Sequence, residues 1–343
     1  MGSSTGAALS IVAPCYDEGA GLRAFYDRVI AACSNSHVQD YEIILVDDGS
    51  HDNTWEVLEE LAVTDHRLIG VRLMRNYGHQ LASTAGLAVS RGHRVMLIDA
   101  DLQDPPELLV DMLRLMDEGA DVVYGKRTLR AGETWFKRAS AAAFYRLAHL
   151  LKVPIPSDTG DFRLMNRRVV DILLAMPEQE RFIRGMVSWI GGKQVPLLYQ
   201  RCPRSTGKSK YSVIRMVNLA ADAVTGFSSA PLRFSLWLGI GVGLIATLLL
   251  AYTLFEWFNG NTIRGWTSIM TVICLFAGVQ LICIGIIGEY VGRLLKETKS
   301  RPLYIIDSIV ARGQNSPVAS DFSRLSHEGR QRALRRMLQG REI

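Results

Sequence analysis

The stretch Val95-Met96-Leu97-Ile98-Asp99-Ala100-Asp101-Leu102-Gln103-Asp104 joins an apolar run directly to a cluster of carboxylates. The apolar run is typical of a buried strand, so the acids are expected where that strand ends. Carboxylates this close repel one another unless a cation compensates them. Mg²⁺ is typically held by one or two carboxylates together with substrate phosphates, so Asp99 and Asp101 indicate a site that handles a nucleotide diphosphate. A D-x-D triplet is also common among the acidic residues of solvent-exposed loops. The rest of the sequence therefore has to support the interpretation as a site for a metal ion and a nucleotide diphosphate.

The context is an α/β pattern, because residues 7–125 alternate short apolar runs with helix-like segments. The predicted strands are Leu9–Ala13, Glu42–Val46, Leu68–Leu73, Arg94–Ile98 and Val122–Tyr124. The predicted helices lie near residues 20–33, 53–64, 78–91 and 105–118. This alternation predicts a mostly parallel sheet with helices on both faces.

Polar clusters follow the predicted strands, and ligands in such sheets bind beyond the carboxyl ends of the strands. The clusters that precede the D-x-D are Pro14-Cys15-Tyr16-Asp17-Glu18, Asp47-Asp48-Gly49-Ser50 and Arg75-Asn76-Tyr77-Gly78-His79-Gln80. All of them are expected at one edge of the sheet. Asp48 can accept hydrogen bonds from a base or ribose there, or can satisfy the backbone of its own turn.

Two stretches near the C-terminal end, Phe234 to Phe255 and Gly265 to Gly288, contain no charged residue. Each reaches the roughly 20 residues that a helix needs to cross the hydrocarbon core, and buried core helices seldom run so long without a charge. Basic residues precede the first stretch and follow the second, so the positive-inside rule predicts both chain ends and the large domain in the cytoplasm.

Two amphipathic segments, Trp135 to Leu151 and Tyr211 to Phe227, are predicted to lie in the membrane interface or, alternatively, to pack on the sheet. The chain therefore divides into a large α/β domain (1–200), a basic loop with a juxtamembrane amphipathic helix (201–233), two transmembrane helices (234–290) and a basic cytoplasmic tail (291–343). The tail is expected to be flexible after Ile309.

Composition narrows the function further. The five cysteines are scattered without a C-x-x-C pair, so neither a disulfide framework nor a zinc site is indicated. There is no charged-then-apolar leader that would indicate secretion. The net charge of +5 fits an anionic membrane or phosphate ligands. The sequence shows no helical stripe of basic residues interleaved with aromatic residues, which is the pattern that would indicate binding of nucleic acid.

A competing motif, Gly19-Ala20-Gly21-Leu22-Arg23-Ala24, matches the dinucleotide-binding pattern G-x-G-x-x-A. Asp17 and Glu18 would then lie against a pyrophosphate and repel it, so these glycines are expected to serve the geometry of the loop instead. A nicotinamide-dependent sugar-modifying membrane enzyme and a non-catalytic lipid-phosphate scaffold or carrier stay as alternatives.

Taken together, the motifs resemble the polyprenyl-phosphate glycosyltransferases, the inverting family 2 enzymes that include bactoprenol glucosyltransferases and dolichol-phosphate mannose synthase. The resemblance covers Ile11 to about Asp307 and adds G-D-F-R-L-M-N-R at Gly160 to Arg167 and R-S-T-G-K-S-K-Y at Arg204 to Tyr211. It implies a GT-A fold, which is Rossmann-like, together with interfacial helices and two C-terminal transmembrane helices. It also implies Mg²⁺ or Mn²⁺, a nucleoside diphosphate sugar such as UDP-glucose, a polyprenyl phosphate acceptor and a homo-oligomer, specifically a tetramer.

The resemblance also assigns site residues. The nucleotide-sugar ligands it implies are Pro14, Tyr16, Glu18, Asp48, Asn76, Gln80, Asp99, Asp101 and Gln103. Among these, it implies that Asp99, Asp101 and Gln103 surround the metal. The residues implied to bind the acceptor phosphate are Arg127, Arg138, Arg204 and Lys210, which belong to basic loops that could also be solvated or bind headgroups. Asp101 and Asp161 are the implied catalytic residues.

Chemistry limits what Asp161 does. A phosphate monoester has a second pKa of about 6, so the acceptor is largely a dianion at cytosolic pH and hardly needs a base. Asp161 is therefore expected to position the acceptor or a metal-bound group, with general base as the alternative. Its place after Gly160 predicts a loop, and an ordinary helix N-cap before Phe162 is a further alternative.

Overall fold

The computed structural model describes residues 7–128, 159–200, 230–259, 265–311 and 314–317. These residues belong to two compact units. Of the described residues, the first unit contains 7–128, 159–200, 301–311 and 314–317, and the second contains 230–259 and 265–300.

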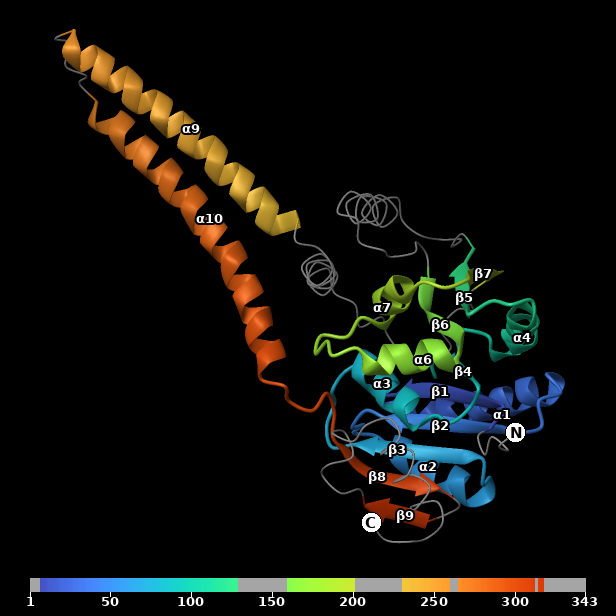
Figure 1. Cartoon of the computed structure of the whole chain (residues 1–343). Coiled ribbons are helices and arrows are strands. Elements are labelled where there is room, and N and C mark those ends of the chain that lie inside the picture. The colour runs from blue at the N-terminus through green and yellow to red at the C-terminus, as the bar shows by residue number, and fades with distance from the viewer. Residues whose placement is uncertain (1–6, 129–158, 201–229, 260–264, 312–313, 318–343) are drawn as a thin grey trace. The chain divides into compact units, whose positions relative to one another are not determined.

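One nine-stranded sheet organises the first unit, in the order β7-β5-β6-β4-β1-β2-β3-β8-β9 (Figure 1). The strands are β1 (Leu9–Cys15), β2 (Tyr41–Asp47), β3 (Leu68–Leu73), β4 (Arg94–Leu97), β5 (Val122–Arg127), β6 (Thr159–Asn166), β7 (Gln194–Tyr199), β8 (Ile306–Ala311) and β9 (Gln314–Pro317). The five predicted strands are all present, and β4, β1, β2 and β3 are parallel as expected. Antiparallel pairing of β6 with β4 and β5, and of β8 with β3 and β9, makes the whole sheet mixed.

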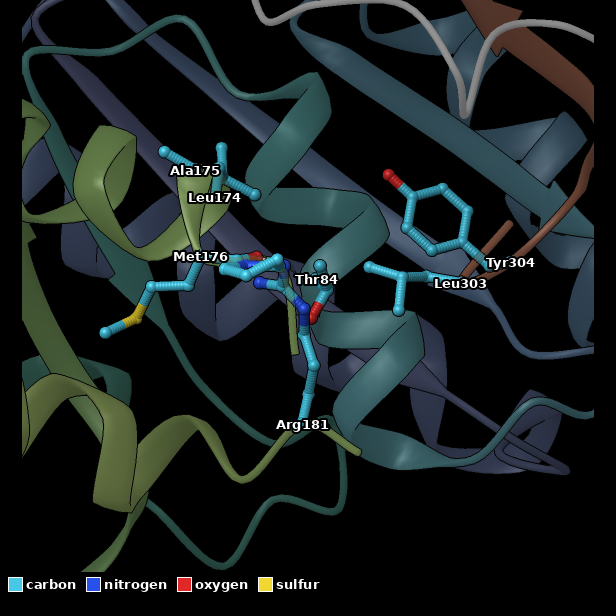
Figure 2. A pocket seen from close by; sticks show the side chains of 8 residues that line it. Thr84, Leu174, Ala175, Met176, Arg181, Leu303 and Tyr304 are labelled. Atoms are coloured by element: carbon cyan, nitrogen blue, oxygen red, sulfur yellow. The ribbon is translucent and has the colours of Figure 1, made fainter. Parts of the chain in front are cut away.

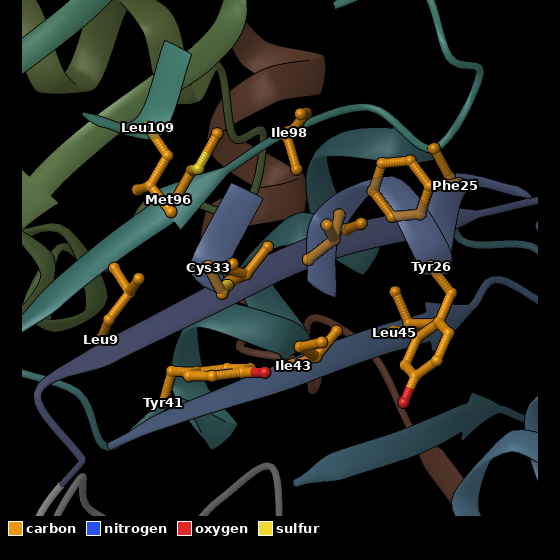
Figure 3. Packing of buried hydrophobic residues seen from close by; sticks show 14 of the residues in the cluster. Leu9, Phe25, Tyr26, Cys33, Tyr41, Ile43, Leu45, Met96, Ile98 and Leu109 are labelled. Atoms are coloured by element: carbon orange, nitrogen blue, oxygen red, sulfur yellow. The ribbon is translucent and has the colours of Figure 1, made fainter. Parts of the chain in front are cut away.

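Helices cover both faces of the sheet, which confirms the α/β fold class. The helices of this unit are α1 (Gly19–Asn35), α2 (Thr54–Thr64), α3 (His79–Val89), the 3₁₀ turn η1 (Pro106–Leu108), α4 (Leu109–Asp117), α6 (Arg167–Ala175) and α7 (Ile183–Ile190). Figure 3 shows the core on one face, where Phe25 of α1 lies over Ile43 and Leu45 of β2. On the other face, Gly86 of α3 lies against the side chains of Val12 and Val46. Because both faces are covered, the central strands β1 and β2 are buried along their whole length and are mostly apolar.

The strand order places the reversal point between β1 and β4. The chain runs outward from β1 to β3 and then returns to β4 on the opposite side of β1. In open α/β sheets, the crevice beyond the carboxyl ends of two such strands is the usual ligand site. Asp99 lies two residues beyond the end of β4 at this point.

Three expectations about secondary structure are wrong. Asp161 lies within strand β6, so it is neither in a loop nor at a helix N-cap. The N-cap of α6 is Asn166, whose side chain accepts the backbone N–H of Val169. The expectation of a flexible tail after Ile309 is wrong for residues 310–311 and 314–317, because β8 and β9 extend the sheet beyond β3. Strand β8 forms by antiparallel pairing with β3, which is distant in sequence, and β9 then pairs with β8.

The second unit contains a hairpin of two long helices, α9 (Ala230–Phe258) and α10 (Trp266–Thr298) (Figure 1). Both are long and apolar enough to cross a membrane. Large apolar side chains on them, such as Leu248 and Leu281, are more than three-fifths exposed. The amphipathic segments 135–151 and 211–227 lie outside the described residues.

Candidate active site

The turn after β4 holds Asp99, Asp101 and Gln103, as the sequence predicts. The backbone N–H of Gln103 donates to Asp101 Oδ1 over 3.1 Å, which closes the turn. Leu102, between them, has a φ of 61°, in the left-handed region that non-glycine residues seldom adopt. The chain thus accepts local backbone strain to direct the polar groups of this turn.

His79, the first residue of α3, bridges two acids that are distant in sequence. Its Nε2 atom lies 3.4 Å from Asp99 Oδ1 and 3.4 Å from Asp161 Oδ2. Partial burial lowers the pKa of His79, but the hydrogen bond to Asp161 and the charges of both acids raise that pKa to about 9. The imidazole is therefore protonated at neutral pH. It links Asp161 to the turn after β4, residues 99–104, which is called the metal turn because its acids would hold a cation.

Asp161 is buried among hydrogen-bond donors and positive charges. Gln80 Nε2 donates to Asp161 Oδ2 over 2.7 Å. Arg163 Nη2 and Arg184 Nε lie 3.6 Å and 3.7 Å from Asp161 Oδ1. Burial alone would raise the pKa of this carboxyl, but His79 and the two arginines hold its pKa well below the usual range. Asp161 is therefore an ionised carboxylate at neutral pH.

Asp99 behaves in the opposite way. Burial raises its pKa to about 6, and the charges of Asp161, Asp104 and Asp101 add to the rise while His79 opposes it. Asp99 Oδ1 is buried and accepts no hydrogen bond from the described residues. A divalent cation would relieve this repulsion, so the donor set fits a hard metal ion. Among the described residues, no three His, Cys, Asp or Glu side chains are arranged to hold a metal, so the Gln103 amide and substrate phosphates would complete its ligands.

Arg127, the last residue of β5, is held beside these acids. Its Nε donates to Tyr199 Oη over 3.3 Å, and the Tyr199 hydroxyl donates in turn to Asp104. Burial and the charge of Asp104 raise the pKa of Tyr199 above its ordinary value, so the hydroxyl keeps its proton. A Cβ atom on Gly160 would lie 2.7 Å from Arg127 Nη2, which places the guanidinium next to the residue that precedes Asp161.

Asp48 is engaged by the backbone of the β3–α3 loop. Its two carboxylate oxygens accept the N–H groups of Tyr77 and Gly78, over 2.7 Å and 2.9 Å. The same loop also contains Asn76 and leads directly into His79 and Gln80. Asp48 therefore orients the loop that carries the two partners of Asp161, whatever further contact it makes with a nucleoside.

The first strand exit places Tyr16 and Glu18 half-buried next to the β2–α2 loop, after the buried Pro14. The N–H of Glu18 donates to Thr54 Oγ1 and the N–H of Gly19 to Asp52 Oδ2, both over 3.0 Å. These contacts occupy backbone donors at the start of α1 that a dinucleotide pyrophosphate would need. The geometry gives the nicotinamide alternative no support.

Sequence reasoning missed several residues of the site. His79 and Asp104 stand inside motifs that the sequence displays, but nothing in one sequence says that they meet Asp161 and Tyr199. Arg163 and Arg184 come from β6 and α7, which were not predicted. Of the predicted phosphate ligands, Arg138, Arg204 and Lys210 lie outside the described residues.

A cavity of about 240 Å³ lies elsewhere, between α3, the end of α6 and the segment before β8 (Figure 2). Its charged residue is Arg181, which donates to the carbonyl oxygen of Leu173 over 2.9 Å and also to that of Met176. These carbonyls end helix α6, so Arg181 serves as a C-terminal cap. None of the predicted site residues lines this cavity.

Comparison with known proteins gives consistent results. Residues 10–173 match the family described as Glycosyl transferase family 2, and residues 230–294 match the GtrB C-terminal hairpin. An uncharacterized glycosyltransferase, YkcC of Bacillus subtilis, is 42% identical over 87% of this chain and 92% of its own length. The bactoprenol glucosyl transferase of Shigella phage SfX is 37% identical over 88% of this chain and 99% of its own. A prophage bactoprenol glucosyl transferase homolog of Escherichia coli K12 is 36% identical, with the same coverage of both chains.

Proposed function

The chain belongs to glycosyltransferase family 2, and we propose that it transfers glucose from UDP-glucose to a polyprenyl phosphate at the cytoplasmic face of a membrane. Family membership confirms the GT-A fold and the glycosyltransferase activity that the sequence motifs imply. The nicotinamide-dependent enzyme and the non-catalytic carrier have no support.

One observation carries the proposal. The ionised Asp161, the acids of the metal turn and the guanidinium of Arg127 converge beyond the carboxyl ends of β1 and β4. In the proposed reaction a diphosphate leaves and a second phosphate attacks, and both groups are negatively charged. The arrangement suits this reaction because the acids would hold a cation next to the diphosphate and Arg127 would bind a phosphate. Relatives named bactoprenol glucosyl transferases, which match nearly their whole length, supply the sugar and the lipid acceptor.

In the proposed reaction, an oxygen of the lipid phosphate attacks the anomeric carbon of the sugar from the face opposite the nucleoside diphosphate. The new bond joins that carbon to the phosphate oxygen, the bond to the diphosphate oxygen breaks, and the anomeric configuration inverts. Asp99, Asp101 and Gln103 would hold Mg²⁺ or Mn²⁺. A divalent cation bound there would neutralise negative charge on the departing diphosphate.

Asp161 acts as a positioning group in this mechanism. The attacking phosphate is largely a dianion above a pH of about 6, so it has no proton that a base would need to remove. The low pKa of Asp161 also makes it a poor proton acceptor. Its fixed charge instead keeps His79, Arg163 and Arg184 ordered around the place where the sugar and the metal meet.

The remaining parts of the proposal concern location and assembly. Helices α9 and α10 cross the cytoplasmic membrane, with the sheet domain and both chain ends in the cytoplasm, and the domain boundaries lie near residues 200, 233 and 290. The length and apolar surface of both helices support the crossing. The protein acts as a homo-oligomer, a tetramer by family resemblance, which the mass of the detergent-solubilised protein would test.

The deciding experiment offers purified protein four donors, UDP-glucose, UDP-galactose, UDP-N-acetylglucosamine and GDP-mannose. Each is supplied with undecaprenyl phosphate and Mg²⁺ or Mn²⁺. We expect UDP-glucose to be consumed and a glucosylated lipid to form. A different preferred donor would correct the sugar, and the absence of any glycolipid with all four donors would reject the proposal.

A further inference from the structure

We propose that Tyr199 and Asp104 are positioning residues that aim the guanidinium of Arg127 at a phosphate group in the active site. This inference rests on the proposed function, in which two phosphate-bearing substrates meet beside Asp161. The phosphate belongs either to the sugar nucleotide or to the lipid acceptor.

The contacts form a chain with a fixed direction. Arg127 Nε donates to Tyr199 Oη over 3.3 Å, and that hydroxyl donates to Asp104 Oδ1. A guanidinium can only donate and an ionised carboxylate can only accept, so the single hydroxyl proton must point at Asp104. Arg127 Nη2 lies 3.9 Å from the same Asp104 oxygen, beyond hydrogen-bond distance. The hydroxyl therefore provides the connection between the arginine and the acid.

The backbone brings these three groups together. Arg127 and Tyr199 are paired residues on the parallel strands β5 and β7. Both the backbone N–H and the side-chain hydroxyl of Thr128 donate to the carbonyl oxygen of Tyr199, over 2.9 Å and 3.0 Å. Asp104 is fully buried at the end of the metal turn. The guanidinium is thus tied, through one hydroxyl, to the turn that carries Asp99 and Asp101.

Two glycines leave the space that this arrangement needs. A Cβ atom on Gly125 would lie 2.8 Å from the Tyr199 ring and 2.7 Å from the Phe162 ring. These rings pack edge to face, with centroids 5.7 Å apart, and so fix the hydroxyl. On the other side, Gly160 leaves room for Arg127 Nη2 next to Asp161. The Nη groups are therefore the part of the guanidinium available to a phosphate in the site.

Without this chain of contacts, the charge of Asp99 would draw the guanidinium of Arg127 toward the proposed metal ligands. An arginine in direct contact with Asp99 would oppose metal binding. Because the Tyr199 hydroxyl takes the Nε donor, the bidentate Nη edge stays oriented for a phosphate.

The test is a double-mutant cycle in full-length protein, with Tyr199→Phe, Arg127→Ala and the double variant. Tyr199→Phe keeps the ring and removes the hydroxyl. We expect it to lower kcat/KM about tenfold or more, the loss expected for one hydrogen bond to a charged group. In the Arg127→Ala background, the same change is expected to alter kcat/KM by less than about twofold, because its target is gone. An equal loss in both backgrounds would overturn the inference.

A matched control exists on the opposite side of the fold. The Tyr26 hydroxyl donates to Asp65 Oδ2 over 2.6 Å, and Asp65 pairs with Arg67, so the group types are the same. Tyr26→Phe is expected to lower the melting temperature and leave kcat/KM unchanged. If Tyr26→Phe reduced kcat/KM as strongly as Tyr199→Phe, the loss would reflect stability and the inference would fail. Asp104→Asn keeps an acceptor for the Tyr199 hydroxyl and loses the charge. It is expected to retain more activity than Tyr199→Phe, and a greater loss would contradict the proposed chain of contacts.

Two binding measurements identify the phosphate and separate this inference from the proposed function. Calorimetry measures the Kd of UDP with Mn²⁺ and, separately, the Kd of farnesyl phosphate. We expect Tyr199→Phe to weaken one of them about tenfold, and the weakened probe identifies whether the phosphate belongs to the donor or to the acceptor. These readouts need no turnover, so they stay decisive if the wild type glycosylates no lipid. If neither Kd changed, the inference would be wrong.

Discussion

Gln80 donates its side-chain N–H to Asp161 over 2.7 Å, and the direction of its amide is fixed by a second contact. The backbone N–H of Ile183 donates to Gln80 Oε1 over 2.8 Å. A backbone N–H cannot accept, so the amide oxygen must face Ile183 and the amide nitrogen must face Asp161. Gln80 therefore ties β6 to the start of α7, which also carries Arg184.

This geometry predicts that Gln80→Glu is a severe variant despite its small change in shape. A carboxylate would place like charge against Asp161 and could no longer donate. We expect kcat at pH 7.5 to fall about 100-fold, the loss that a small misplacement of catalytic groups can cause. Activity relative to the wild type should recover as the pH is lowered, because the introduced carboxyl group can donate again once it is protonated.

Gln80→Met is the control, because it removes both hydrogen bonds and adds no charge. We expect a smaller loss than for Gln80→Glu, with no recovery at low pH. The interpretation of Gln80 as a partner of Asp161 would not survive if Gln80→Glu matched the wild type, or if both variants showed the same pH dependence.

Asp101→Asn should remove turnover without unfolding the protein. The amide oxygen can still accept the Gln103 N–H, so the turn is preserved, but the charge that would hold a divalent cation is lost. The thermal melting curve should match the wild type, while kcat with Mg²⁺ or Mn²⁺ should fall below detection. Asp27→Asn, at an exposed position on α1, is the matched control and should keep full activity. Near wild-type activity of Asp101→Asn would exclude it from the metal site.

The central sheet and the metal turn could be predicted from the sequence, because continuous apolar strands followed by polar clusters specify a parallel sheet covered on both faces. Asp99 and Asp101 need only local information, since they lie in one turn. The motif around Asp161 identifies it as a site residue, but the sequence predicts a loop or a helix N-cap there and the structure has a strand. Strand β6 is defined by pairing with β4 and β5, whose positions along the chain are distant.

The same reason explains why the partners of Asp161 were missed. His79, Arg163 and Arg184 come from three separate elements, and only the folded chain shows that they surround one carboxylate. Strand β8 falls in the predicted tail because its register is set by β3 across more than 200 residues of sequence, as the pair Ile69 with Ala311 shows, and β9 in turn pairs with β8. Periodicity within a short window carries no signal for such pairing.

The proposed topology predicts that the turn between α9 and α10 faces away from the cytoplasm. A cysteine introduced at Asn259 in a background without native cysteines should react with a membrane-impermeant maleimide in intact cells. A cysteine introduced at Ser320 should react only after the cells are opened. The reverse labelling pattern would place the sheet domain outside the cytoplasm and would contradict the proposed location.

Asp161→Asn distinguishes positioning from proton removal. If Asp161 removed a proton from the acceptor, the loss would be greatest at low pH, where the phosphate monoanion accumulates, and would recover above the phosphate pKa of about 6. The structure favours positioning, because the low pKa of Asp161 leaves it ionised and unable to hold a proton in this range. We therefore expect the ratio of wild-type to variant kcat to stay nearly constant between pH of about 6.5 and 8.5.

The substitution has a second consequence, which the measurement has to separate from the first. Asp161→Asn would leave Arg163, whose side chain is 3% exposed, beside a neutral partner. Breaking a buried ion pair from one side costs roughly 3–5 kcal/mol, so the melting temperature should fall. The pH dependence of kcat at saturating donor, acceptor and metal, normalised to the folded fraction at each pH, is independent of that loss. Recovery at alkaline pH would reject the positioning role, and wild-type rates throughout would remove Asp161 from the active site.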